Sequence, residues 1–475
     1  MMYRPIALVV GVLHLVSSAP ARAQGAASSS DTLRLSLQDA VTIGLRTGDE
    51  VGLAAAQALT AEAQYDLARA SLLPQLRLNS SYTRTFESAR SNAVSSVFNQ
   101  PNTYTVNANF SQTLFQGGRL LAAARAANAL ADAAQLTAEE RKALFTVEIQ
   151  RAYLGALLAE RLAQLQQTNL QLASARLAQV QQFHNAGRAA QYDVLRAKVE
   201  RANIEPLTIQ ARNDRDLAHL ELKRLLNIPV EQPLALTTSL DPESAQAFVA
   251  SYQDTSLTAQ RPALRAAELA ARSRRLAMTA ARGELMPAVT FFFQTGFMAF
   301  PPPGYGFPTV RGALVSTGCP QGRTQCQNGG WFEDRNMGIQ FSWPVFDGLR
   351  AKSALEFARA QTRIADLELR IERERVAVEV ARARAELQRA KSVFDARRET
   401  ASEANEAFRL ASLRFSRGLS TQLEVSDAQL ALLTAESSEA RATIDLFLAT
   451  AELARTLGRP IPMPPAGAPQ RRTNE

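Results

Sequence analysis

Hydrophobic and polar positions along this chain predict two very long helices. The first runs from Gly118 to Ala186 without a proline and with one internal glycine, Gly155, and the second runs from Gly348 to Arg417. At 1.5 Å per residue each helix would be about 100 Å long. A globular domain has no room for such a rod, so an elongated molecule is expected.

A shorter helical pattern follows each rod, over residues 189–227 and 420–457, and an amphipathic segment, Leu35 to Leu73, precedes the first hairpin. The preceding segment and the return helix together approach the length of one rod. We therefore expect a rod packed beside a pseudo-continuous pair of helices, twice per chain. The second rod also carries a stripe with the seven-residue step of a coiled-coil seam, which we interpret as packing: Ile364, Ile371, Val378 and Ala385.

Alternating residues predict two β-hairpins, at about 75–115 and 288–346. In the first strand, for example, Leu76 and Leu78 flank Arg77. Each strand has about 10 to 12 residues, enough to cross a bilayer when tilted. The pattern favours a β-barrel with an apolar outer face and a polar interior, and the half-buried sheet of a soluble protein is the alternative.

The sequence is internally duplicated. Residues 114–119 (LFQGGR) return at 345–350 (VFDGLR), and from there the copies run without a gap at an offset of 231 (346 − 115). Leu73-Pro74 matches Met286-Pro287 at an offset of 213 (287 − 74), so the second hairpin is 18 residues longer (231 − 213). Duplication with one variable loop indicates a repeat architecture.

These patterns divide the chain into a signal peptide and two repeats. Arg4, the apolar run from Ile6 to Val16 and the small residues around Ala23 are typical of a secretory signal. The predicted parts are a signal peptide at 1–23, a first repeat at 24–228, a linker at 229–261, a second repeat at 262–458 and a disordered tail at 459–475. The rods occupy 118–186 and 348–417 within the repeats.

Charge and side-chain chemistry argue against nucleic-acid binding and against an enzyme. The formal net charge is +8, and it would be +6 without Arg4 and Arg22 (8 − 2). The remaining charges alternate along helices, as in residues 370–375 (RIERER), which is typical of a solvated helix surface. His184 and His219 have no nucleophile or carboxylate partner evident in the sequence. We predict no catalytic residues, no cofactor and no metal site.

Cys319 and Cys326 are the only cysteines, and both lie in the long loop of the second hairpin. In an exported protein a disulfide between them is favoured. A metal site is the less favoured alternative, because two sulfurs without a nearby histidine do not complete a zinc shell.

Four strands per chain are too few to close a barrel, for which about eight are needed. Two chains would supply eight strands around a filled interior, and three chains would supply twelve around a pore. Closure therefore predicts an oligomer, most simply a homotrimer in which the rods continue the pore as a tube of helices.

These features resemble the TolC-like outer membrane efflux proteins over essentially the whole mature chain. The resemblance rests on the order and duplication of several short motifs, each of them weak alone. They are the segment 35–41 (LSLQDAV), the Leu-Leu-Pro approach to the hairpins, Phe-x-Gly-x-Arg at 115–119 and 346–350, and the two helix-tip motifs at 182–197 and 414–428.

The resemblance implies a mainly α fold with a small transmembrane β part. It implies a trimer with a 12-stranded β-barrel in the outer membrane of a Gram-negative-type bacterium and an α-helical barrel in the periplasm. The linker and the C-terminal residues would form a belt around the middle. The implied function is the exit duct of a tripartite efflux or type I secretion system for small molecules or polypeptides. Implied partners are outer membrane lipid, a periplasmic adaptor and an inner-membrane pump of RND, ABC or MFS type.

The tips of the two helical hairpins are the candidate functional site. Gly187 and Gly418 are expected to mark the periplasmic turns, since glycine permits a tight reversal. Glu424 and Asp427 lie three residues apart on one helix face. By the resemblance they occupy positions that ring the closed mouth, where carboxylates would attract cations. Solvated surface charges are the alternative interpretation.

The latch of the family is incomplete in this sequence. Phe415 and Ser420 stand where the family has an aromatic hydroxyl and an arginine, although Asp193 keeps its place in the first tip. Arg188 or Arg417 could substitute for the missing arginine.

A periplasmic coiled-coil scaffold or adaptor without a pore is the alternative function. Extraction by detergent rather than by salt would favour the channel, because only the channel has strands facing lipid.

Overall fold

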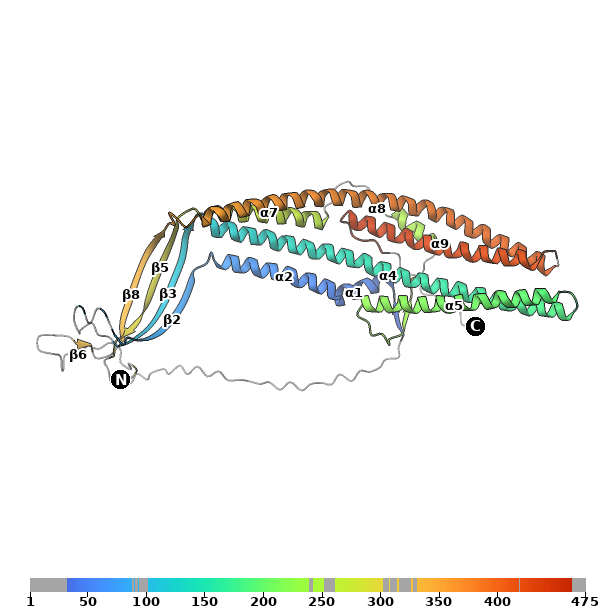
Figure 1. Ribbon diagram of the computed structural model, residues 1–475, viewed down its shortest axis with the longest axis horizontal. Helices are drawn as coiled ribbons and strands as arrows, with labels where there is room; N and C mark the ends of the chain where they lie inside the picture. The colour runs from blue at the N-terminus through green and yellow to red at the C-terminus, as the bar shows by residue number, and fades with distance from the viewer. Residues whose placement is uncertain are drawn as a thin grey trace.

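The computed structural model describes residues 32–463, except 88, 90–92, 94–100, 239–241, 252–260, 302–306, 308–313, 316–325, 328–330 and 418. The predicted signal peptide therefore lies outside the described residues. The molecule is long and narrow, with a β-sheet at one end and two helical hairpin tips at the other (Figure 1). No helix in the described part of the chain is both long and apolar enough to cross a membrane.

The helices confirm a mainly α fold built from two copies of one unit. The rods are α4 (Arg119–Asn185) and α8 (Arg350–Ser416), of 67 residues each. The return helices are α5 (Gln191–Leu225) and α9 (Gln422–Thr456), of 35 residues each. The helices before the hairpins are α2 (Asp49–Ala70) and α7 (Pro262–Gly283), of 22 residues each. Because equivalent helices have equal lengths, the duplication seen in the sequence is also present in the structure.

The segment expected to form one amphipathic run from Leu35 to Leu73 is broken into α1 (Leu37–Thr47) and α2. The break lies at Gly48, where a Cβ atom would approach the Phe145 ring to 2.6 Å. Close packing against α4 therefore requires glycine at this point. Ser36 caps α1 by accepting a hydrogen bond of 3.1 Å from the backbone N–H of Asp39.

The sheet is antiparallel, in the order β2 (Gln75–Arg84), β3 (Asn102–Gln116), β5 (Ala288–Ala299) and β8 (Trp331–Ser342). Its register aligns Tyr82, Tyr104, Ala299 and Trp331 in one row. Because side chains alternate along a strand, the apolar positions of all four strands share one face. Strands β2 and β8 are the two edges, and a separate short pair is formed by β6 (Leu314–Val315) and β7 (Cys326–Gln327).

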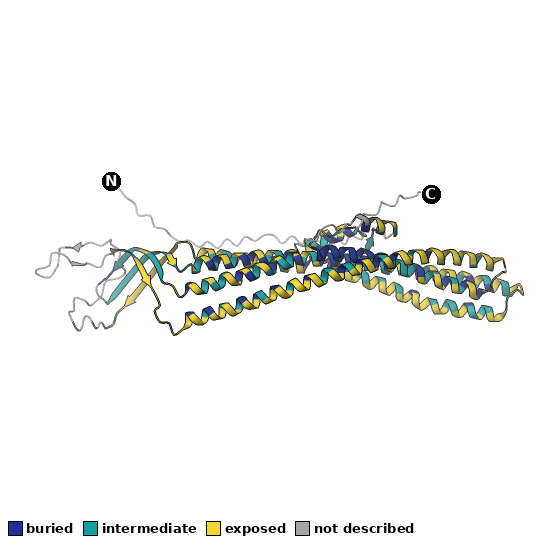
Figure 2. Ribbon diagram, turned by 90° about the horizontal axis from the view of Figure 1, so that it is seen from above, coloured by how far each residue is buried: buried dark blue, intermediate teal, exposed yellow. Residues whose placement is uncertain are grey.

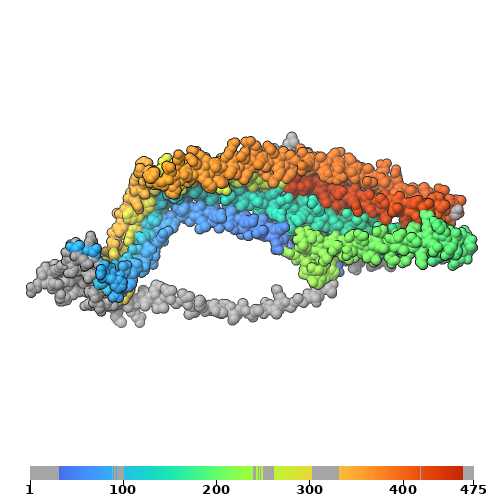
Figure 3. Space-filling model, viewed as in Figure 1, coloured from blue at the N-terminus to red at the C-terminus, as the bar shows by residue number. Residues whose placement is uncertain are grey.

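The helices form a curved wall beside the sheet (Figure 3). In the half nearest the sheet, α4 packs against α2 and α7, and α7 also packs against α8. In the other half, α4 pairs with α5, α8 pairs with α9, and α9 joins the two pairs through α4. The helix α4 is therefore the element that connects the two copies.

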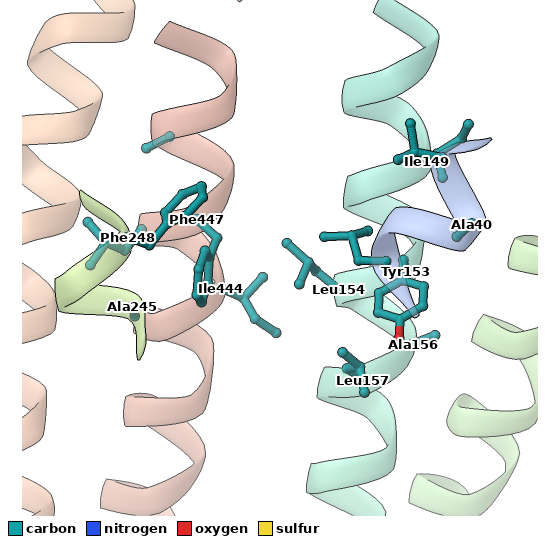
Figure 4. Close-up of a cluster of buried hydrophobic side chains, with 14 of the residues drawn as sticks. Ala40, Ile149, Tyr153, Leu154, Ala156, Leu157, Ala245, Phe248, Ile444 and Phe447 are labelled. Carbon is teal, nitrogen blue, oxygen red and sulfur yellow. The ribbon is translucent and has the colours of Figure 1, made fainter. Parts of the chain in front are cut away.

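The main core lies near the middle of the rods, where burial is greatest (Figure 2). Here Ile149, Tyr153 and Leu154 of α4 are fully buried beside the N-terminal strand, and Phe447 packs on Phe248 at 4.9 Å between ring centroids (Figure 4). The described part of the linker contains two regular elements, β4 (Leu234–Leu236), which pairs in parallel with β1 (Leu33–Leu35), and α6 (Pro242–Ser251).

The C-terminal tail differs in part from the expected disorder after residue 458. The carbonyl oxygen of Pro462 accepts a hydrogen bond of 3.1 Å from Gln150 Nε2, and Met463 packs against the main core. Ordered packing thus extends to residue 463, and residues 464–475 lie outside the described part.

Candidate functional site

The two tips are built alike. At the first tip the chain reverses through Gly187, whose φ is +71°. The backbone N–H of Arg188 donates to the carbonyl of Phe183 at 2.8 Å, and at the second tip Leu419 donates to Arg414 in the same way at 2.8 Å. These bonds close the last helical turn and leave room for a short reversal. Gly418 lies outside the described residues.

Arg188 and Arg417, the arginines proposed as latch substitutes, are exposed, and each contacts residues of its own tip. The guanidinium of Arg188 lies over the Phe183 ring, 5.1 Å from its centroid. Arg417 is the C-cap that follows α8, and its backbone N–H donates to the carbonyls of Leu413 and Arg414. Within this single chain, therefore, the structure does not join Arg188 to Asp193.

Asp193 and Glu424 are equivalent in the two repeats, and both cap the helix on which they lie. The backbone N–H of Ala190 donates to Asp193 Oδ2 at 3.1 Å. At the second tip, Thr421 and Glu424 form a reciprocal capping box, with Glu424 N–H donating to Thr421 Oγ1 at 3.3 Å. Glu424 and Asp427 are both exposed. The Glu424 carboxylate is thus held at the start of α9, where the helix dipole favours negative charge.

A buried arginine joins α9 to the first hairpin just above the second tip. Arg176 of α4 donates to Ser426 Oγ at 2.8 Å and to Gln429 Oε1 at 2.5 Å. The same guanidinium forms an ion pair of 3.2 Å with Glu200 of α5. Burial lowers the pKa of Arg176 and the Glu200 charge opposes that effect. We call the set Arg176, Glu200, Ser426 and Gln429 the tip network.

The sequence patterns do not predict the tip network, although the burial pattern of α4 contains one signal for it. Ala173, Arg176 and Val180 are all buried on one face of α4. A charged residue at a buried step of helical periodicity requires partners, because an unpaired buried charge is costly. The network fixes α9 at Ser426. This residue is two positions after Glu424 and one position before Asp427.

A second buried network lies where α4, α7, α8 and α9 meet. Arg261, the N-cap of α7, donates to Glu140 Oε1 from Nε at 2.9 Å and from Nη2 at 2.7 Å. Arg455 of α9 donates to the same oxygen at 3.1 Å, and Arg261 also pairs with Glu379 of α8. Burial lowers the pKa of Arg261, but the hydrogen bonds that Arg261 donates to Glu140 and Glu379 outweigh it and raise the pKa overall. We call Arg261, Glu140, Arg455 and Glu379 the middle network.

The predicted disulfide lies outside the described residues, since Cys319 and the side chain of Cys326 are not among them. Within the described part of the chain, no three histidine, cysteine, aspartate or glutamate side chains cluster as metal ligands.

Comparisons with known proteins agree with this architecture. A family model described as outer membrane efflux protein matches residues 50–227 and 255–459. The chain is 25% identical over 439 residues to the pyoverdine export outer membrane protein OpmQ of Pseudomonas putida. The aligned region covers 89% of this chain and 85% of that protein.

Solved structures share the fold. The CmeC outer membrane channel of Campylobacter jejuni superposes with a TM-score of 0.71 at 15% identity, covering 89% of this chain and 85% of that one. The outer membrane protein VceC of Vibrio cholerae superposes with a TM-score of 0.68 at 19% identity, covering 89% and 96%.

Proposed function

The chain belongs to the outer membrane efflux protein family, and from this membership we propose how it builds a channel. The protein is an outer membrane efflux channel, the exit duct of a tripartite efflux system, and its helical part lies in the periplasm.

We propose that three copies assemble into one channel. The observation that carries this is the four-stranded sheet, in which β2 and β8 each have a neighbour on one side only. Open edges with an apolar face require further strands, and four strands from each of three chains would close a 12-stranded barrel around a pore. The rods would then form a tube roughly 100 Å long.

The tips would form the periplasmic mouth. Glu424 and Asp427 of three chains would place six carboxylates around its axis, an arrangement that favours cations. The exposed tip turns would contact a periplasmic adaptor, and through it the channel would receive cargo from an inner-membrane pump. The residues proposed for that contact are Gly187, Arg188, Asp193, Arg417 and Gly418.

Two measurements test the proposal. Light scattering of the mature protein in mild detergent should give the mass of a trimer, and reconstitution in planar bilayers should give stepwise conductance. A monodisperse monomer would contradict the assembly. A stable trimer without conductance, even after the mouth charges are removed, would favour a scaffold without a pore.

A further inference from the structure

A groove on one face of the helical wall, in the half nearest the sheet, combines arginines with leucines. It lies between α2, α4 and α7 and has a volume of about 540 Å³. Each of these helices contributes one arginine to its lining, and the three are Arg69, Arg125 and Arg272. All three are exposed, and within the described part of the chain their guanidinium groups form no ion pair or hydrogen bond. We call this groove the arginine groove.

The arginine groove carries a net positive charge. The one carboxylate among its lining residues is that of Asp132, whose Oδ2 already accepts a hydrogen bond of 3.2 Å from Asn128 Nδ2. Elsewhere on the same helix as Arg272, by contrast, Arg275 pairs with Asp366 at 2.6 Å. Three arginines that line one groove repel one another unless an anion lies between them. The groove therefore suits an anionic ligand.

Each helix also places a leucine on the sheet side of its arginine. The helices α2 and α7 run toward the sheet, and there Leu72 and Leu276 follow the arginine of their own segment. The helix α4 runs away from the sheet, and Leu121 precedes its arginine. The groove is therefore apolar near the sheet and cationic farther from it. The lining residues beyond the arginines include two hydrogen-bond donors, and they are Tyr65, Asn128 and Leu269.

The arginine groove is on the face of the wall that also carries the linker. In a packed coil, steps of seven residues keep one face of a helix, and four such steps lead from Arg125 to Tyr153. The Tyr153 hydroxyl bonds the Leu35 carbonyl at 2.8 Å and Thr238 Oγ1 at 2.9 Å, so this face of α4 meets β1 and the segment after β4. Three linkers inside the proposed tube would obstruct it. The linker, and with it the groove, therefore lies on the outer face.

The groove begins beside the exposed apolar residues at the junction between the sheet and the helices. Phe115, Trp343 and Phe346 are 49%, 55% and 82% exposed there. Aromatic residues at the ends of barrel strands lie at the membrane–water interface. Arg125 is six residues beyond the start of α4 at Arg119 (125 − 119), about 9 Å along the helix axis. The arginines therefore lie on the periplasmic side of this interface, within reach of lipid headgroups.

We propose that the arginine groove binds the phosphate of an anionic phospholipid in the inner leaflet of the outer membrane. In that leaflet the acyl chains point toward the sheet and the headgroups point away from it, and the apolar and cationic parts of the groove have the same order. Guanidinium groups form paired, charge-assisted hydrogen bonds with phosphate oxygens. Basic pockets between helices recognise lipid headgroups in this way. The inference rests on the proposed tube only for the assignment of the outer face.

The internal duplication shows that packing does not require these arginines. The offset of 231 relates Arg125 to Glu356, and the offset of 213 relates Arg272 to Leu59. The helices α2 and α8 form with those residues, at the same lengths as their counterparts. The three arginines therefore occur together in only one of the two repeats, and we expect one lipid site per chain.

Lipid retention by the full mature protein tests the proposal. The protein in mild detergent is mixed with phosphatidylglycerol or with phosphatidylcholine of the same chain length, and native mass spectrometry counts the lipids that stay bound. We expect up to one phosphatidylglycerol per chain, retained about tenfold more than phosphatidylcholine. Combining Arg69→Gln, Arg125→Gln and Arg272→Gln should reduce retention of phosphatidylglycerol to that of phosphatidylcholine. Each single variant should lose part of the retention.

The matched control removes three arginines from α5, which lies in the half of the molecule away from the sheet (Figure 1). Arg201→Gln, Arg215→Gln and Arg224→Gln together should retain phosphatidylglycerol as the unchanged protein does. If the triple groove variant does not assemble, the three single variants decide the question.

Three results would overturn the proposal. They are equal retention of both lipids by the unchanged protein, unchanged retention in the groove variants, and displacement of all bound lipid by inorganic phosphate, which would make the ligand a soluble anion. Light scattering of the same samples reports the assembly separately. A trimer that retains no phosphatidylglycerol would therefore remove the lipid site and leave the proposed channel standing.

Discussion

The hydroxyl of Tyr153 donates a hydrogen bond of 2.8 Å to the carbonyl oxygen of Leu35, which is 118 residues away in the sequence. The same hydroxyl accepts from the backbone N–H of Thr238 at 3.2 Å. One phenol on α4 therefore holds both β1 and the segment after β4 against the middle of the rods. This contact attaches the short linker elements to a molecule that consists mostly of helices.

Tyr153→Phe should lower the free energy of unfolding by about 1–3 kcal/mol. The change leaves the buried N–H of Thr238 without an acceptor, whereas the Leu35 carbonyl keeps a bond from Thr237. Thermal unfolding in detergent would measure the loss. Tyr192→Phe on exposed α5 is the control and should change little.

The same side chain predicts a loss of stability in alkali. Burial raises the pKa of Tyr153, and hydrogen bonds from Thr238 oppose that effect only in part. A raised pKa in the folded state means that its contribution is fully present below the unfolded value of about 10 and is lost as the pH rises further. The fall in stability between about pH 9 and 11 should therefore be shallower in Tyr153→Phe. An unchanged slope would contradict this role.

Arg176→Met should destabilise the tips by about 3 kcal/mol. Removing one partner of a buried ion pair leaves the other without compensation, and the loss is moderated here because Glu200 keeps some contact with water. Arg201→Met, which breaks an exposed pair with Glu205 on the same helix, should cost no more than about 1 kcal/mol. Denaturant unfolding of both variants gives the comparison, and equal effects would mean that the tip network adds nothing.

Glu424→Gln with Asp427→Asn should weaken cation selectivity and remove block by divalent or trivalent cations applied from the periplasmic side. Glutamine can still serve in a capping box, so the start of α9 should remain folded. Planar bilayers give the readout. Glu399→Gln with Glu403→Gln removes the same charge from exposed positions on α8 and is the control. If the mouth variant kept both properties, the carboxylates would be surface charges only.

Gly187→Ala should cost about 1 kcal/mol, because a φ of +71° is strained for any residue with a Cβ atom. A Cβ atom added here would meet nothing within 4 Å, so the cost is conformational and not steric. Gly155→Ala, in the interior of α4 and equally open, should instead stabilise by up to about 1 kcal/mol. Opposite shifts in melting temperature are the expected result.

The elements that sequence could predict are those with local periodicity. The rods and hairpins follow from helical and alternating patterns that each segment carries by itself, and the duplication follows from residue matches such as Phe115 with Phe346. The two buried networks depend on residues far apart in the chain. Arg261 falls at the end of the predicted linker, and nothing in the neighbouring sequence indicates that it meets Glu140, 121 residues earlier.

The orientation of the apolar stripe on the second rod, α8, was also beyond the sequence. Periodicity identifies an apolar face but does not say whether the partner belongs to the same chain. Ala133 and Ile364 occupy equivalent places in the two rods, yet the first is buried and the second is about half exposed. Which face is covered depends on how the first repeat packs against the second, and that packing is a property of the whole fold.

The matched helix lengths set the distance between the sheet and the tips. The rods have 67 residues each and the return helices 35 each, so both hairpins reach the same plane. A deletion in one helical hairpin alone would shorten that hairpin, so its tip could no longer reach a partner that the other tip contacts. Steps of seven residues made in both hairpins at once would shorten the molecule and keep its seams in register. The span is therefore set at two places in one gene, and it can change only when both change together.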